Sequence, residues 1–297
     1  MSSLLIDSCG DIMGEINNLF DPRSPDYLPP QTVIVTGPAE GITLDTADVT
    51  FIWRHANSAY WPDTTDTGNV YDYAGRIFYS YRVDNAWSDW ISGEMVRGSD
   101  MPNHTYEENT GKHIIQLRGL EDGPHRFEVR SKYPSDMEES FWPIRNYSIN
   151  AIEGTAMIVS PGYVYPDSGS TFVIEIKIID VTDLLGAHLV LNYDAAILSV
   201  VGYNIKTEEN DLLTLSNGDS LEFVENDAEA GRFDASVVII GGTVTGISGS
   251  GILARIRFQH IGRTGLSDLE IAPESSLRNV YNEELLEIRR GGHVVVW

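Results

Sequence analysis

Cysteine, basic residues and long apolar runs are all scarce in this sequence. Of its 297 residues only Cys9 is a cysteine, which excludes an internal disulfide framework and a cysteine-based metal site. No run of about 18 apolar residues occurs, so the sequence predicts no transmembrane helix. The 20 Lys and Arg stand against 44 Asp and Glu, for a formal net charge of −24. Because phosphate groups are bound by clustered basic side chains, this charge argues against nucleic acid or an anionic membrane as the main partner.

Motifs of catalysis are missing as well. The seven histidines are scattered, and no Ser/His/Asp, His-x-x-x-His, phosphate-loop or dinucleotide pattern occurs. We therefore expect a protein that is not an enzyme, with no catalytic residues, no cofactor and no metal site. The acidic residues 225–229 offer oxygen ligands for Ca²⁺ but lack the spacing of a calcium loop, so solvated surface is the favoured interpretation.

The N-terminal sequence has an apolar triplet, Leu4-Leu5-Ile6, followed by Cys9. This order resembles the end of a bacterial lipoprotein signal, which implies lipidation of Cys9 and a lipid anchor. The match departs from the pattern at Asp7, where a small or apolar residue is usual, and it lacks a basic segment. A plain cysteine in a tail is the alternative. Residues 11–30 are rich in proline and aspartate, so we predict that residues 1–30 form a flexible tether.

From residue 31 onward the sequence predicts short strands separated by turn residues, at the regular spacing of a β-sandwich. Three segments resemble fibronectin type III and immunoglobulin-like modules of bacterial surface proteins: residues 50–53 (TFIW), 81–90 (YRVDNAWSDW) and 120–130 (LEDGPHRFEVR). His125 stands where that family has a corner tyrosine, whose hydroxyl is anchored on upstream backbone. A ring N–H of His125 can do the same, so we expect a structural role for it.

The insert at residues 58–73 is too long for a hairpin loop and carries four aromatic residues beside three aspartates. Aromatic rings next to carboxylates can grip sugar rings, which makes these side chains candidates for carbohydrate binding. The alternative, which we favour, is that the rings are buried against the sheet, because burial of an aromatic ring stabilises more than most surface uses of it. The candidates are Tyr60, Trp61, Tyr71 and Tyr73.

The second half of the chain again predicts strands, and three of its segments resemble a cohesin domain. These are residues 159–173, residues 181–198 with Tyr193-Asp194, and residues 249–258 with their Gly-x-Gly-x-Leu-Ala start. The resemblance implies a nine-stranded jelly-roll sandwich. We therefore predict an all-β chain of two β-sandwich domains, at residues 31–153 and 154–297.

The cohesin resemblance also implies docking of a dockerin, a small calcium-binding module, on one sheet face. Two residues that make polar contacts in that family, an Asn and an Asp, are replaced by Gly186 and His188 here. Alternation predicts the outward residues of the face. They are His188, Val190, Asn192, Val238, Ile240, Leu253, Arg255 and Arg257.

These patterns predict an extracellular or cell-surface binding protein with the first domain as spacer. One alternative is a polysaccharide-binding protein, supported by the aromatic insert. Another is a purely structural spacer in a surface layer.

Overall fold

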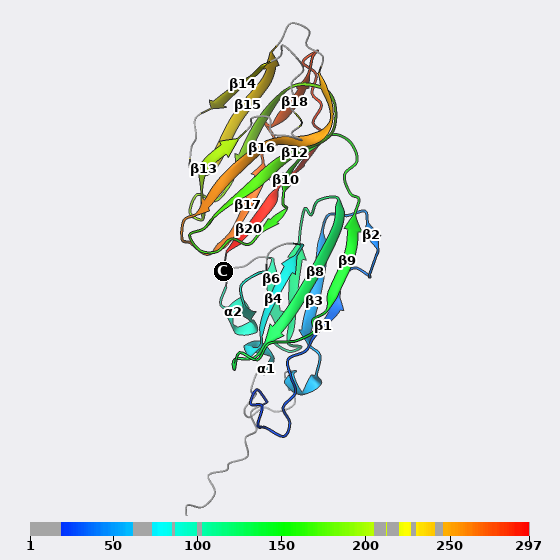
Figure 1. Cartoon of the computed structure of the whole chain (residues 1–297), viewed down its shortest axis with the longest axis vertical. Coiled ribbons are helices and arrows are strands. Elements are labelled where there is room, and N and C mark those ends of the chain that lie inside the picture. The colour runs from blue at the N-terminus through cyan, green and yellow to red at the C-terminus, as the bar shows by residue number, and fades with distance from the viewer. Residues whose placement is uncertain are drawn as a thin grey trace, which may run out of the picture.

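The computed structural model describes residues 19–61, 73–84, 87–99, 103–204, 212, 220–226, 230–240 and 246–296. Within them the chain is nearly all β, as predicted, and forms two sandwiches joined end to end (Figure 1). No helix in these ranges is long and apolar enough to cross a membrane.

The N-terminal sandwich consists of two sheets. One sheet has the order β1 (Thr32–Thr36), β3 (Val49–His55), β7 (Lys112–Leu117) and β6 (His104–Glu107). The other has the order β2 (Thr43–Leu44), β9 (Ile144–Ile149), β8 (Gly123–Lys132), β4 (Phe78–Val83) and β5 (Ile91–Ser92). Short helical turns lie between the strands: η1 (Ser58–Tyr60), α1 (Tyr73–Arg76) and α2 (Gly93–Arg97).

Aromatic side chains fill the space between these two sheets. In β3, Val49, Phe51 and Trp53 alternate inward, and Phe51 stacks on Phe127 of β8 with ring centroids 3.7 Å apart. Each fully buried large side chain contributes about 1.5–3 kcal/mol relative to exposure. The inward side chains of β3 therefore form part of this core.

His125 lies at the start of β8 and anchors the chain as predicted. Its Nε2 contacts the carbonyl oxygen of Glu121 at 2.7 Å, and its Nδ1 contacts a carboxylate oxygen of Asp84 at 2.7 Å. Burial lowers the pKa of this imidazole, but the hydrogen bonds to Asp84 and to the Glu121 carbonyl outweigh that effect, so the pKa lies above its ordinary value.

Residues 19–30 pack against the far end of this sandwich, although the sequence predicted a tether as far as residue 30. Phe20 is buried, and the Tyr60 hydroxyl donates a hydrogen bond to the Leu19 carbonyl at 2.8 Å. The Tyr133 hydroxyl donates to the Leu28 carbonyl at 2.8 Å. Composition alone missed this because a few apolar side chains are enough to hold an extended segment on a surface.

The C-terminal sandwich contains the strands from residue 156 onward. They are β10 (Ala156–Ser160), β11 (Tyr163–Val164), β12 (Thr171–Asn192), β13 (Leu198–Asn204), β14 (Ser220–Asn226), β15 (Arg232–Ile240), β16 (Ile247–His260), β17 (Gly265–Ile271), β18 (Ser276–Asn279), β19 (Ile288–Arg290) and β20 (Gly292–Val296).

The long strand β12 takes part in two ladders. Its residues 171–181 pair with β10 and β16, and β16 pairs in turn with β13; we call this ladder the β16 sheet. Its residues 184–192 pair with β15, β17 and β18, and β15 pairs with β14; we call this ladder the β15 sheet. One core cluster contains buried side chains of both, including Ile174, Ile256, Leu189 and Phe233, so the two sheets pack face to face.

The crossing of β12 between the two sheets is a local feature of residues 180–183. Asp180 and Asp183 have φ values of +50° and +56°, a region that Asp enters more readily than most residues. The amide of Asp180 donates to the Ser250 hydroxyl at 2.9 Å, and that of Asp183 donates to the Ser248 hydroxyl at 3.0 Å. Gly249, between the two serines, has a φ of +125°, a conformation that glycine adopts without steric cost.

Side chains of the C-terminal sandwich also close the core of the N-terminal one. Tyr163 and Val295 are buried in the N-terminal core cluster, and Tyr165 packs against Tyr81 with ring centroids 5.7 Å apart. Polar contacts surround them: the Arg118 amide donates to the Tyr163 hydroxyl at 2.6 Å, and an Arg290 guanidinium nitrogen donates to the Leu120 carbonyl at 2.9 Å. The two sandwiches therefore share a buried junction.

The first prediction concerns this junction. Tyr165→Ala removes a partly buried aromatic side chain from the contact between the sandwiches, and we expect a loss of about 1–3 kcal/mol in the free energy of unfolding. Because the junction joins both cores, urea should unfold both sandwiches in one transition. Tyr281→Ala is the matched control, since Tyr281 is 78% exposed. Separate transitions, or equal effects of the two variants, would contradict the shared junction.

The second prediction concerns three buried histidines of the N-terminal sandwich. Desolvation lowers the pKa of His55 to about 4 and that of His104 to about 3, and it lowers the pKa of His113 as well. His104 Nε2 lies 3.1 Å from His113 Nδ1, and the His113 ring stacks on Trp53. Histidine in an unfolded chain titrates near 6.5, so below that pH the unfolded chain binds more protons than the folded one.

The stability contributed by these neutral histidines is thus complete above about pH 6.5 and is lost as the pH falls. The loss is on the order of 1 kcal/mol per pH unit for each histidine. We expect the melting temperature to fall less between pH 7 and pH 5 in His113→Phe, which keeps a ring against Trp53, than in the wild type. Tyr281→Ala, at an exposed tyrosine, should behave as the wild type does. Equal slopes in all three proteins would refute the explanation.

Candidate functional site

The eight residues predicted to form one binding face are divided between the two sheets. His188, Asn192, Val238 and Ile240 lie on the outer side of the β15 sheet, where Gly186 pairs with Val238 and His188 with Ser236. Arg255 and Arg257 lie in β16, which pairs with the first part of β12 and with β13. Since the inner sides of both sheets meet in one core, the two groups face opposite sides of the sandwich.

Leu253 was predicted to point outward and is buried in the core instead. The register of β16 against β12 shifts here: Ile176 pairs with Ala254, but the next residue, Lys177, pairs with Ile252. Leu253 is the extra residue of a β-bulge, and a bulge changes which side the following residues face. Alternation across the whole segment therefore placed Leu253 wrongly while it placed Arg257 correctly.

Val190 was also predicted to be exposed and is fully buried, although it does not belong to the core cluster. The connection from β17 to β18 runs beside it. The Ala272 amide donates to the Val190 carbonyl at 2.9 Å, and the Val190 amide donates to the Ser275 hydroxyl at 2.9 Å. A connection that packs on a strand from elsewhere in the sequence leaves no signal in the strand itself.

The remaining residues of the β15 sheet form what we call the His188 face: His188, Asn192, Val238 and Ile240. The exposure pattern of β15 confirms the register, since Val238 is 38% and Ile240 45% exposed while the residues between are buried. His188 Nε2 contacts an Asp234 carboxylate oxygen at 2.9 Å, and Arg232 donates to the other oxygen of Asp234 at 2.9 Å. This network fixes the imidazole on a half-exposed surface.

A hollow of about 300 Å³ lies on the His188 face between β12, β15 and β18. Gly186 forms part of its floor: a Cβ at this position would lie 3.3 Å from the Val237 carbonyl oxygen. A side chain at Gly186 would therefore be tightly packed against this backbone oxygen. Ala187, Val237 and Val238 line the hollow together with Arg278 and Asn279, which we call its rim.

The turn after β18 holds the rim in place. The Asn279 side-chain oxygen accepts hydrogen bonds from the amides of Tyr281 and Glu283, both at 2.9 Å. Arg278 forms an ion pair with Glu284 at 3.0 Å. No sequence motif indicated this turn, although its Asn-rich composition is typical of tight turns.

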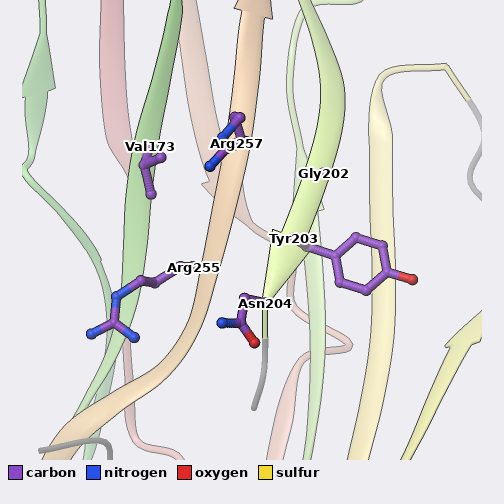
Figure 2. A pocket seen from close by; sticks show the side chains of 6 residues that line it. All are labelled: Val173, Gly202, Tyr203, Asn204, Arg255 and Arg257. Atoms are coloured by element: carbon purple, nitrogen blue, oxygen red, sulfur yellow. The ribbon is translucent and has the colours of Figure 1, made fainter. Parts of the chain in front are cut away.

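The second group of residues surrounds a shallow depression of about 230 Å³ on the outer side of the β16 sheet (Figure 2). It is lined by Val173, Gly202, Tyr203, Asn204, Arg255 and Arg257. We call it the Arg257 basin. Arg255 donates to a Glu175 carboxylate oxygen at 3.2 Å.

The aromatic residues proposed for sugar binding are largely committed to packing. Tyr60 is fully buried, with its ring against Tyr133, so it cannot stack on a sugar. Trp61 lies under the Arg54 guanidinium at 3.4 Å, and Tyr73 packs edge-on against Phe20. Tyr71 lies outside the described residues. The burial that the sequence analysis favoured for this insert is thus correct for Tyr60.

Two other candidate sites fall at the limits of the described residues. Cys9 lies outside them. Of the acidic residues 225–229, the first two belong to the backbone of β14 and the others lie outside. Within the described ranges no group of three or more His, Cys, Asp or Glu side chains is placed to hold a metal ion.

These features describe an all-β protein with one regular sheet face that bears a hollow. No family model and no curated protein matches the sequence. Among solved structures, a cohesin from Clostridium acetobutylicum is 20% identical over 48% of this chain and 92% of its own, with a TM-score of 0.38. A non-cellulosomal cohesin from Archaeoglobus fulgidus is 17% identical over 49% of this chain and 92% of its own, with a TM-score of 0.38.

A type I cohesin–dockerin complex from Clostridium thermocellum is 17% identical over 49% of this chain and 100% of its own, with a TM-score of 0.38. Identities and TM-scores this low do not establish membership of the cohesin family.

The third prediction compares the two apolar side chains that alternation placed on one face. Leu253→Ala removes a buried side chain, and we expect it to lower the free energy of unfolding by about 2–5 kcal/mol. Ile240→Ala, on the exposed side of β15, should change it by no more than about 0.5 kcal/mol. Urea denaturation followed by tryptophan fluorescence measures both. A neutral Leu253→Ala would place that side chain outside the core after all.

Proposed function

We propose that this chain is a non-catalytic, extracellular or cell-surface binding protein that docks a protein partner through the His188 face. The observation that carries the proposal is the hollow floored by Gly186, with the exposed side chains of Val238 and Ile240 on the strand beside it. An apolar surface of this kind on a regular sheet is typical of a site that another molecule covers.

A protein fits this surface better than a small ligand does. The hollow is open and shallow, and its apolar floor is surrounded by polar groups of His188, Arg278 and Asn279. Protein interfaces have this composition, with an apolar centre and a polar rim. The Asp234 carboxylate and the Arg232 guanidinium hold His188 in one orientation, so a partner can form a hydrogen bond with a ring that is already positioned.

The class of partner that we propose is a dockerin-bearing protein. Its support is the resemblance of residues 154–297 to a cohesin domain. Arg255 and Arg257 are not part of this proposal, because they lie on the opposite side of the sandwich from His188.

The N-terminal sandwich would serve as a spacer. The described chain begins at one end of this sandwich, and the C-terminal sandwich adjoins its other end (Figure 1). Burial of Tyr163 and Val295 in the N-terminal core would keep the spacing fixed.

Binding of recombinant dockerin modules from the source organism, measured by calorimetry, tests the proposal and is the fourth prediction. Val238→Asp places a charge on the apolar part of the His188 face, and we expect it to weaken binding at least 100-fold. Val201→Asp is the matched control, because Val201 is 47% exposed but lies on β13 in the other sheet. It should bind as the wild type does.

Two outcomes would overturn this function. If the wild type binds none of the dockerins, the partner class is wrong. If Val238→Asp and Val201→Asp weaken binding equally, the face is wrong. A purely structural spacer would remain if neither dockerins nor polysaccharides bind.

A further inference from the structure

The Arg257 basin lies on the β16 sheet, away from the His188 face. The residues beside Arg257 on the neighbouring strands carry no charge that could neutralise its guanidinium. Arg257 pairs across the sheet with Val173 on one side and with Gly202 on the other. Neither neighbour has a polar side chain. Within the described residues Arg257 makes no ion pair or hydrogen bond through its guanidinium, and its side chain is exposed.

The neighbouring arginine on the same strand shows the contrast. Arg255 pairs across the sheet with Glu175 and with Asn204, and it donates to the Glu175 carboxylate at 3.2 Å. Several other arginines of this acidic chain are also paired with carboxylates, for example Arg82 with Glu128 at 2.6 Å and Arg232 with Glu274 at 2.7 Å. Within the described residues Arg257 therefore differs from these arginines in having no carboxylate beside its guanidinium.

The backbone of β13 leaves room next to Arg257. The register between β13 and β16 shifts between Val200 and Gly202, and a Cβ built at Gly202 would meet nothing within 4 Å. Tyr203 turns its ring away from the basin (Figure 2) and packs against Phe233 with centroids 5.4 Å apart. Val173, which is 43% exposed, provides an apolar wall. The basin thus combines a guanidinium and an amide with an apolar side chain.

We propose that the Arg257 basin binds a carboxylate carried on a short aliphatic stem, the chemistry of a glutamate side chain. The carboxylate would accept hydrogen bonds from the guanidinium of Arg257, which suits two-oxygen anions, and the stem would lie against Val173. A large polyanion does not fit, because the net charge of −24 repels every one of its charges, whereas a single carboxylate has only one.

The fifth prediction uses small probes in NMR titrations of the full chain. N-acetylglutamate amide should shift the arginine Nε–H signal of Arg257 and the amide signals of Gly202 and Val173, with millimolar affinity. Arg257→Gln should weaken this binding at least tenfold. Arg263→Gln is the matched control, since Arg263 is an exposed arginine in the loop after β16, and it should change nothing. Acetate, which lacks the stem, should bind several-fold more weakly than the glutamate probe.

Three results would overturn the proposal. Equal shifts with inorganic phosphate and the glutamate probe would indicate general attraction of anions. Equal effects of Arg257→Gln and Arg263→Gln would place the binding elsewhere. Binding that appears only in Glu208→Gln/Glu209→Gln, within the acidic sequence after β13, would assign the basin to a carboxylate of this chain.

A glutamate-containing peptide that binds like the free probe would identify a protein partner as the source.

The proposal is independent of the docking function. Arg257→Gln should leave docking at the His188 face unchanged, and Val238→Asp should leave glutamate binding unchanged.

Discussion

The crossing of β12 from one sheet to the other is the constraint on which the C-terminal sandwich depends. Asp180 and Asp183 adopt positive φ values there, and the hydroxyls of Ser250 and Ser248 accept hydrogen bonds from their amides. A continuous strand that changes sheets contributes side chains to one core from both of its halves. Its outward side chains, however, face opposite directions before and after the crossing. The His188 face therefore lies beside the second half of β12, and the Arg257 basin lies beside the first half.

The separation has a consequence for binding. The His188 face has an apolar hollow with a polar rim, whereas the Arg257 basin has a cation beside an apolar wall. One partner of ordinary size cannot cover both, because the core lies between them. The two sites can thus be occupied independently, and the shared junction with the N-terminal sandwich can hold both in fixed positions relative to that domain.

Basic side chains are paired with carboxylates that lie close to them in the fold. The chain has a net charge of −24, and several of its basic side chains form contacts with carboxylates of the same chain. Arg232 and His188 both contact Asp234, and Arg82 contacts Glu128. Such pairs orient side chains more than they stabilise the fold, since partly exposed ion pairs contribute only about 0–1 kcal/mol. Arg257 differs because the strands beside it offer valine and glycine.

The sequence by itself determined the all-β class, the strands with strict alternation and the inward or outward direction of residues within one regular strand. Val238, Ile240 and Arg257 were placed on the outward side correctly for this reason: period-two alternation follows from backbone geometry alone. The anchoring role of His125 was also readable, because its partner lies four residues away. Only the tertiary structure decided that Leu253 occupies a bulge and that the β17–β18 connection buries Val190. It also decided that Arg257 and His188 face opposite sides, because pairing between distant strands is set by the whole sheet and leaves no local pattern in either strand.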